Sequence, residues 1–378
     1  MSDVLIAGYA RSPFTPARKG ELAKVRPDDI AAQVVRALVE RTGIDPADVE
    51  DLIVGCAFPE GEQGFNVARL IAFLAGLPNS VGGATVNRFC GSSMQAIHMA
   101  AGAIQMGAGE AFICAGVESM TRIPMGGFNP LPNPALYERF PQAFASMGET
   151  AENLAKKHGI ARQRQEEMAV GSQQKAAAAQ GGGRFDDEIV PIATKNGTVT
   201  RDGCLRPETT LEGLAGLELA FDQNGTVTAG TSSPLTDGAA ATLVVSEAYA
   251  ERKGLKPLAR IKSFAISGCQ PEIMGIGPVL SSRKALSRAG IGLDEVDVVE
   301  LNEAFAAQAL ACVDELGLDM AKTNLDGGAI ALGHPLGATG ARITGKAAAL
   351  LAREGKKYAL ATQCIGGGQG IATVLEAV

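Results

Sequence analysis

The sequence contains no tryptophan and few of the residues from which metal and disulfide sites are built. Its three histidines, His98, His158 and His334, are too few for a site with several histidine ligands. Its seven cysteines are odd in number and include no Cys-x-x-Cys pair, which argues against a disulfide framework and against a zinc ribbon. This usage indicates a reducing compartment, and we expect neither a bound metal nor a permanently bound cofactor.

Long apolar runs and an excess of positive charge are also missing. No stretch of about 18 apolar residues suggests a membrane span. The first residues lead directly into a strand, without a basic or arginine-rich presequence. The formal net charge of −7 argues against nucleic acid and against an anionic membrane surface as partners. We therefore expect a cytoplasmic protein.

What the sequence does contain is typical of a globular α/β protein. Of its 378 residues, 46% are apolar and 20% are charged, and 47 are glycine. Helical periodicity over 27–41 and 65–74 alternates with strand patterns at 4–7, 52–55, 84–89 and 111–116. The last of these is apolar throughout, as in a parallel sheet covered on both faces. The alternation predicts a sheet with helices on both sides.

The second half of the chain resembles the first. The segment 285–299 repeats the pattern of 37–53: a helix, a Gly-Ile turn, an acidic cap and a strand. Between the halves lies a region rich in proline and turns. We predict a duplicated α/β core with an inserted domain. Residues 1–117 would form the N-terminal core half, completed by 236–258, residues 118–235 the insertion, and residues 259–378 the C-terminal core half.

One stretch, residues 84–98, combines a short strand, a sharp turn at Cys90 and a helix rich in small residues. Unpaired N–H groups and the helix dipole converge at a helix start and favour a thiolate, the reactive form of cysteine. Cys90 is therefore a candidate nucleophile. The alternative is a buried structural cysteine at the end of a strand.

A nucleophilic cysteine needs a base within reach, and the candidates are few. His98 lies two helical turns beyond Cys90 and is expected to pack in the core. His334 lies in a glycine-lined turn before a helix, which is the position of Cys90 in the duplicated scheme. Cys364 opens a glycine cluster whose N–H groups could form an oxyanion hole. Asn302 follows an apolar strand, where it could instead cap a helix.

Four motifs resemble the signature blocks of the thiolase family, in family order and spread along the chain. They are residues 87–96, 302–306, 327–342 and 364–370. The resemblance implies the five-layered αβαβα thiolase fold with a loop domain, residues 118–235, that binds CoA. It also implies thiolytic cleavage of a 3-ketoacyl-CoA by CoA, giving acetyl-CoA and a shortened acyl-CoA. Coenzyme A would be a co-substrate.

The resemblance also implies a role for each candidate residue. Cys90 would carry the acyl group, and His334 would activate it. His334 and a water held by Asn302 would form one oxyanion hole, and the N–H groups of Cys90 and Gly366 the second. Cys364 would be the acid and base at the α-carbon. Three further residues match positions that line the path of CoA or its pantetheine arm: Ser233, Arg206 and Phe305.

Several features favour the degradative thiolases of fatty-acid oxidation. The motif around Cys90 and the segments 207–215 and 225–238 resemble theirs. Short-chain acetoacetyl-CoA thiolases often carry a histidine where this chain has Ser146. A short-chain acetyl-CoA acetyltransferase remains the alternative. The resemblance also implies a homodimer or homotetramer, and relatives of this type often join the α-subunit of a β-oxidation multienzyme complex.

Three other classes of protein fit less well. A β-ketoacyl synthase uses Cys-His-His or Cys-His-Asn, but here Cys364 takes the place of the acid and base. A non-catalytic acyl-CoA-binding or lipid-binding relative is expected to lack Cys90, His334 or Cys364, and all three are present. A cysteine hydrolase needs neither a second cysteine nor a CoA-binding domain.

Overall fold

The computed structural model describes residues 3–378, and two similar halves make up its core. The first half contains β1 (Val4–Arg11), β2 (Thr15–Pro16), α1 (Pro27–Thr42), β3 (Asp51–Gly55), α2 (Val67–Ala75), β4 (Gly82–Val86), α3 (Ser92–Gln105), β5 (Ala111–Ser119), β8 (Thr236–Ser246) and α8 (Glu247–Lys253). The second half contains β9 (Ala259–Gly268), α9 (Gly277–Ala289), β10 (Val298–Leu301), α10 (Ala306–Leu316), α11 (Ala329–Leu332), α12 (Leu336–Glu354), β11 (Tyr358–Ile365) and β12 (Gln369–Glu376).

The strand order repeats between the halves and confirms the predicted duplication. The first half runs β4-β3-β5-β8-β1, with β4, β3 and β5 parallel and β8 and β1 antiparallel to their neighbours. The second half runs β10-β11-β12-β9 in the same directions, and a parallel bridge from Val299 to Thr323 stands in the place of β4. A two-residue contact between β1 and β9 joins the halves.

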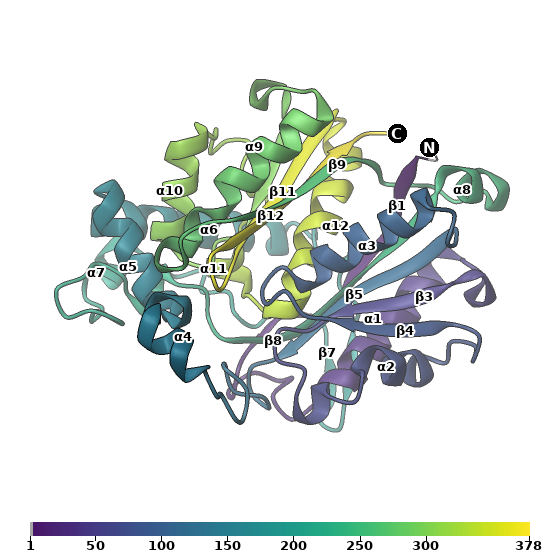
Figure 1. Ribbon diagram of the computed structural model, residues 1–378, viewed down its shortest axis with the longest axis horizontal. Coiled ribbons are helices and arrows are strands. Elements are labelled where there is room, and N and C mark those ends of the chain that lie inside the picture. The colour runs from purple at the N-terminus through teal and green to yellow at the C-terminus, as the bar shows by residue number, and fades with distance from the viewer. Residues whose placement is uncertain (1–2) are drawn as a thin grey trace.

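The elements stack as five layers, in agreement with the predicted fold class (Figure 1). Helices α1 and α2 cover the outer face of the first half, and α9 and α10 that of the second. Helices α3 and α12 lie against each other between the halves and contact strands of both. Glycine permits this close packing: a Cβ at Gly340 of α12 would lie 2.3 Å from the backbone nitrogen of Met94 in α3.

The segment between β5 and β8 carries α4 (Pro134–Arg139), α5 (Met147–His158), α6 (Arg162–Gly181), β6 (Ile192–Thr194), β7 (Gly197–Val199) and α7 (Leu211–Ala215). Helices α4, α5 and α7 gather at one side of the molecule (Figure 1). Strand β5 ends at Ser119, two residues beyond the predicted boundary of the core half. The division into domains remains an interpretation of the sequence.

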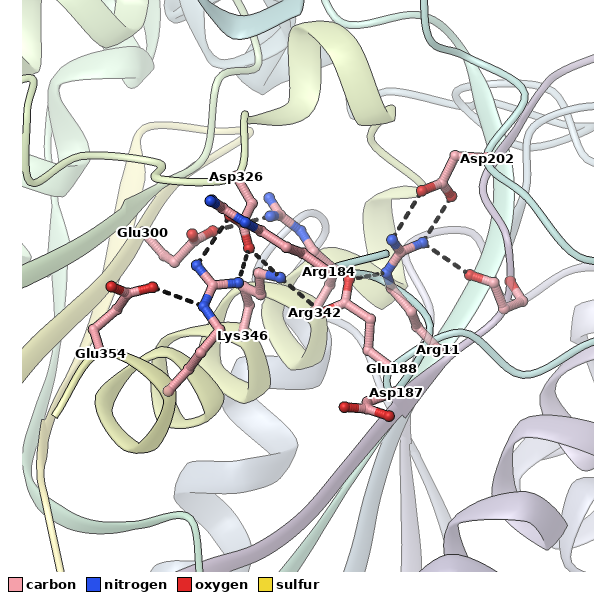
Figure 2. A network of polar contacts seen from close by, with 12 residues as sticks. Arg11, Arg184, Asp187, Glu188, Asp202, Glu300, Asp326, Arg342, Lys346 and Glu354 are labelled. Carbon is pink, nitrogen blue, oxygen red and sulfur yellow. Dashed lines mark hydrogen bonds and ion pairs between the residues drawn. The ribbon is translucent and has the colours of Figure 1, made fainter. Parts of the chain in front are cut away.

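Buried ion pairs tie this segment to the core (Figure 2). Arg11 of β1 is fully buried and contacts Asp202 at 2.7 Å and Glu188 at 2.8 Å. Lys346 of α12 contacts Glu188 at 2.9 Å and Asp326 at 2.7 Å. Each charge has partners of opposite sign, as buried charges require. The network therefore links both core halves to the inserted segment.

Two further observations concern individual helices. Helix α2 begins at Val67 rather than at the predicted Phe65, because Phe65 and Asn66 have φ angles of 54° and 53°, in the left-handed region. Within residues 3–378, no helix is both long enough and apolar enough to cross a membrane.

Candidate active site

Cys90 lies in a tight turn between β4 and α3. The residue before it, Phe89, has a φ of 43°, which is uncommon for a residue other than glycine. Two side chains hold this conformation. Asn87 Oδ1 accepts the Phe89 N–H at 2.8 Å, and Ser92 Oγ donates to the Phe89 carbonyl at 2.6 Å. The turn directs Cys90 into the protein, where it is 8% exposed.

Backbone N–H groups at the turn do favour a Cys90 thiolate, as predicted, but the loss of solvent outweighs them. Burial raises the pKa of Cys90 to about 12. The N–H of Gly366 lowers it and the nearby carboxylate of Glu118 raises it, but both effects are smaller than that of desolvation. Helix α3 begins at Ser92, two residues further on. The resting sulfur is therefore a thiol, and its activation needs a base.

His334 is positioned as a neutral base. Its Nδ1 lies 2.6 Å from Thr339 Oγ1, which also lies 3.2 Å from the Pro335 carbonyl. The carbonyl can only accept, so the hydroxyl donates to it and accepts from Nδ1–H. The Nε2 atom then keeps its lone pair and faces Asn302 Nδ2 at 3.4 Å. Burial, aided by the charge of Arg342, lowers the pKa of His334 to about 3.

Cys364 lies near the end of β11 and faces the same region as Cys90. Burial raises its pKa well above the usual range, and the neighbouring Cys90 sulfur raises it further. The preceding residue, Gln363, donates its side-chain N–H to the Cys90 carbonyl. Gly366, just after β11, directs its N–H toward the Cys90 sulfur. The second half of the core therefore supplies a second thiol and an N–H donor beside Cys90.

A cavity of about 620 Å³ opens beside these groups. Cys90, Gly366 and Leu336, which lies two residues after His334, form part of its wall. Most of the remaining wall comes from the segment 125–147 and is largely apolar: Met125, Gly126, Pro130, Leu131, Pro132, Ala143, Phe144, Ala145, Ser146 and Met147. The cavity is thus largely apolar and reaches Cys90 and Gly366.

Of the three residues predicted along the CoA path, Phe305 shares an apolar cluster with Cys364. Met147 packs against the same cluster, and the Phe305 ring meets Phe221 edge-on at 5.8 Å. The Ser233 N–H donates to the Ala304 carbonyl at 3.0 Å, which places Ser233 beside this cluster. Arg206 lines a separate, narrow pocket of about 30 Å³.

The structure adds residues that the sequence analysis missed. Thr339 orients the His334 ring, and Thr236 Oγ1 accepts the His334 N–H at 3.0 Å. Glu118 lies 1% exposed at the end of β5. Glu118 could have been identified from the sequence, because it is a charged residue near the end of an apolar strand. Thr339 lies five residues after His334, but nothing in the sequence indicates that its hydroxyl faces the ring.

Two protein-family models together match nearly the whole chain. Residues 4–248 match the family model described as thiolase, N-terminal domain, and residues 255–377 match thiolase, C-terminal domain. The 3-ketoacyl-CoA thiolase of Bacillus subtilis is 46% identical over 389 residues, and that of Aliivibrio fischeri 50% identical over 386. Each alignment covers 100% of both chains.

Solved structures agree. Human mitochondrial 3-ketoacyl-CoA thiolase superposes with a TM-score of 0.92 at 39% identity, covering 100% of this chain and 99% of the human one. A second structure of that enzyme, in complex with CoA, has the same TM-score and identity. The Bacillus anthracis acetyl-CoA acetyltransferase also has a TM-score of 0.92, at 40% identity, and the same coverage.

Proposed function

Because this chain belongs to the thiolase family, we propose that it cleaves a 3-ketoacyl-CoA with CoA to give acetyl-CoA and a shortened acyl-CoA. The reaction is an acyl transfer through an acyl-Cys90 intermediate. The observation that supports it best is the pairing of two buried thiols, Cys90 and Cys364, beside a neutral His334 and an apolar cavity. A cysteine hydrolase does not require a second thiol beside its nucleophile.

The first half of the reaction breaks the bond between C2 and C3. His334 Nε2 takes the proton of Cys90, whose sulfur attacks the C3 carbonyl. The N–H groups of Cys90 and Gly366 stabilise the oxyanion at C3. The bond electrons move onto the acetyl-CoA fragment as a thioester enolate, which the protonated His334 and Asn302 stabilise. Cys364 then gives its proton to C2, and acetyl-CoA leaves.

The second half transfers the acyl group to CoA. The Cys364 thiolate takes the proton of the CoA thiol, and the CoA sulfur attacks the thioester on Cys90. The Cys90 sulfur leaves as a thiolate and recovers its proton from His334. Every residue returns to its starting protonation state, and no metal or redox group takes part. Coenzyme A is thus a co-substrate, and its pantetheine arm would pass Phe305 and Ser233, with Arg206 further along the inserted segment.

The cavity wall supports an acyl chain longer than that of acetoacetyl-CoA. Burying each methylene of such a chain is favourable by about 0.8 kcal/mol. Ser146, where short-chain enzymes often have histidine, lines the cavity and also caps α5. The alternative, a short-chain acetyl-CoA acetyltransferase, retains support from the Bacillus anthracis enzyme.

The two thiols can be separated by experiment. Cys364→Ala should still exchange acyl groups between acyl-CoA and labelled CoA, although more slowly, because exchange moves no proton to or from carbon and His334 can pass the Cys90 proton to the departing CoA thiolate. It should lose carbon–carbon cleavage of 3-ketoacyl-CoA by at least 100-fold. Cys90→Ala should lose both reactions. Loss of exchange and cleavage to the same extent in Cys364→Ala would contradict the division of roles.

The same cleavage assay, run with 3-ketoacyl-CoA chains of four to sixteen carbons, decides the substrate class. We expect kcat/KM to rise with chain length. Activity confined to the four-carbon substrate would establish the short-chain alternative.

We also propose a homodimer, or a tetramer of two such dimers. Strand β4 is an edge strand with one neighbour, β3, in the described part of the chain. Two large apolar side chains are exposed, Phe65 at 93% just before α2 and Met106 at 84% at the end of α3. Unpaired strand edges readily pair with a second chain. Light scattering at micromolar concentration should give at least twice the chain mass of 38.8 kDa, and a monomer would contradict this.

The seven cysteines are all free within residues 3–378. A mechanism with two reduced thiols supports a reducing location such as the cytoplasm. Association with a β-oxidation α-subunit stays a prediction from the family resemblance.

A further inference from the structure

A buried carboxylate, Glu118, lies between the turns that carry Cys90 and His334. It is 1% exposed, and every group that residues 3–378 place on its two oxygens is a hydrogen-bond donor. The donors are the N–H groups of Ala57 (2.8 Å), Gly337 (2.9 Å) and Phe58 (3.4 Å), Gln63 Nε2 (2.7 Å) and the Cys56 thiol (3.8 Å). An ionised carboxylate is the side chain that can accept from all of them.

On one side, Glu118 holds the turn of His334. Gly337 lies in the first turn of α12, where backbone N–H groups lack partners within the helix. The preceding N-cap residue, Pro335, has no side-chain acceptor to offer. Glu118 of β5 supplies the acceptor instead, and its charge suits a helix N-terminus. The His334 turn is thereby held against the sheet of the first half.

On the other side, the contacts continue to the turn of Cys90. The peptide N–H of Ala57 donates to Glu118, and the carbonyl of Ala57 accepts from Asn87 Nδ2 at 2.9 Å. The other end of the same amide, Asn87 Oδ1, accepts the N–H of Phe89, the residue with the left-handed φ. A continuous path therefore runs from Gly337 through Glu118, Ala57 and Asn87 to the residue before Cys90.

We propose that Glu118 and Asn87 are positioning residues that fix the spacing between the nucleophile Cys90 and its base His334. Neither touches the reacting atoms. The two turns come from different halves of the duplicated core, so contacts between the halves set their separation. The packing of α3 against α12 is one such contact, and the path adds a direct connection between the two turns. The inference rests on the proposed function, because it concerns the proton transfer from Cys90 to His334.

The expected effect is on turnover rather than on substrate binding. Misplacing a catalytic group by about 1 Å can reduce the rate about 100-fold. Glu118→Gln replaces one carboxylate oxygen by an amide NH₂, which cannot accept from the N–H groups of Ala57 and Gly337. This substitution breaks the path at its centre. Asn87→Ala breaks it next to Phe89, and because Asn87 is exposed this variant should fold normally. We expect each variant to lower kcat 10-fold to 100-fold and to change KM for 3-ketoacyl-CoA and CoA less than threefold.

The double variant distinguishes positioning from general structural damage. Two breaks in one path remove the same constraint. The kcat of the double variant should therefore be close to that of the less active single variant. Independent damage would multiply the two losses. Asp297→Asn is the matched control. Asp297 also accepts two backbone N–H groups of another segment, those of Lys357 and Tyr358, but at the opposite end of β10 from Asn302. Asp297→Asn should keep the parent kcat. Combined with Asn87→Ala, it should give the same kcat as Asn87→Ala alone.

Each outcome has a clear meaning. Parent kcat in folded Asn87→Ala, or multiplied losses in the double variant, would overturn the positioning role while leaving the proposed function intact. If Glu118→Gln fails to fold by circular dichroism, Asn87→Ala alone decides. A parent protein that cleaves no 3-ketoacyl-CoA would overturn the proposed function, and the inference with it.

Discussion

At the scale of single residues, burial determines the chemistry of the site. Both thiols are protonated at rest, and His334 is neutral, because each side chain is removed from water. The sequence correctly placed Cys90 at a turn before a helix, but it could not show how completely the sulfur is desolvated. A reactive thiolate would then exist only when substrate and base are both in place.

The other buried histidine, His98, gives a prediction about acid stability. Its Nε2 lies 2.8 Å from Thr373 Oγ1 and its ring stacks on Phe264 at 4.2 Å. Burial, with a smaller effect of Arg88, lowers its pKa to about 3. Below its ordinary pKa of about 6.5, the unfolded chain binds a proton at this residue that the folded protein does not, so stability falls as the pH falls.

His98→Gln keeps a hydrogen-bonding group for Thr373 and cannot take up that proton. Between pH 6.5 and pH 4.5, the parent should therefore lose up to about 1.4 kcal/mol of unfolding free energy per pH unit more than the variant. Urea unfolding at several pH values measures the difference. Parallel pH curves for the two proteins would show that His98 is not the group responsible.

At the scale of elements, the close approach of α3 and α12 depends on missing side chains. A Cβ at Gly340 of α12 would meet the Met94 backbone nitrogen at 2.3 Å. On α3, by contrast, no atom of residues 3–378 outside the helix lies within 4 Å of the Cβ position of Gly102. The two glycines lie in the same layer but in opposite environments.

Alanine substitutions at Gly340 and Gly102 should therefore change the stability of the protein in opposite directions. Gly340→Ala should destabilise the protein by about 1–3 kcal/mol, because backbone must shift to admit the methyl group. Gly102→Ala should stabilise it by up to about 1 kcal/mol through higher helix propensity. Urea unfolding of both variants tests the pair. Similar changes of the same sign would contradict this account of the central layer.

The elements were largely predictable, and their contacts were not. Local periodicity gave the strands and helices around Cys90 and the repeat of 37–53 at 285–299, because these patterns depend on neighbours in sequence. The contact of Glu118 with Gly337 joins residues 219 positions apart and depends on how the halves dock. Such a pairing leaves no periodic trace in the sequence.

At the scale of the whole molecule, buried charges connect the inserted segment to both halves of the core. Arg11, Glu188 and Lys346 form a continuous chain of ion pairs from β1 to α12 (Figure 2). Removing one member leaves a buried charge without its partner, which is more costly than losing a pair on the surface. The inserted segment and the core should therefore unfold together.

Arg11→Leu should lower the unfolding free energy by about 3–5 kcal/mol, because Asp202 loses its buried cation and Glu188 keeps only Lys346. The exposed pair of Arg164 and Asp314 provides the control, and Arg164→Ala should cost about 0–1 kcal/mol. Urea unfolding followed by circular dichroism measures both. A second, separate transition in Arg11→Leu would show instead that the segment detaches from a core that stays folded.

The wall of the apolar cavity comes mainly from one continuous segment, whereas the catalytic groups come from both halves of the core. Under the proposed function, substrate range and reaction chemistry therefore depend on different parts of the chain. Residues 125–145 could be exchanged with those of a relative that accepts another acyl length. This exchange should change the preferred chain length of the substrate, measured as kcat/KM, and leave the cleavage reaction intact. This modularity makes the segment the natural starting point for engineering the length of the product.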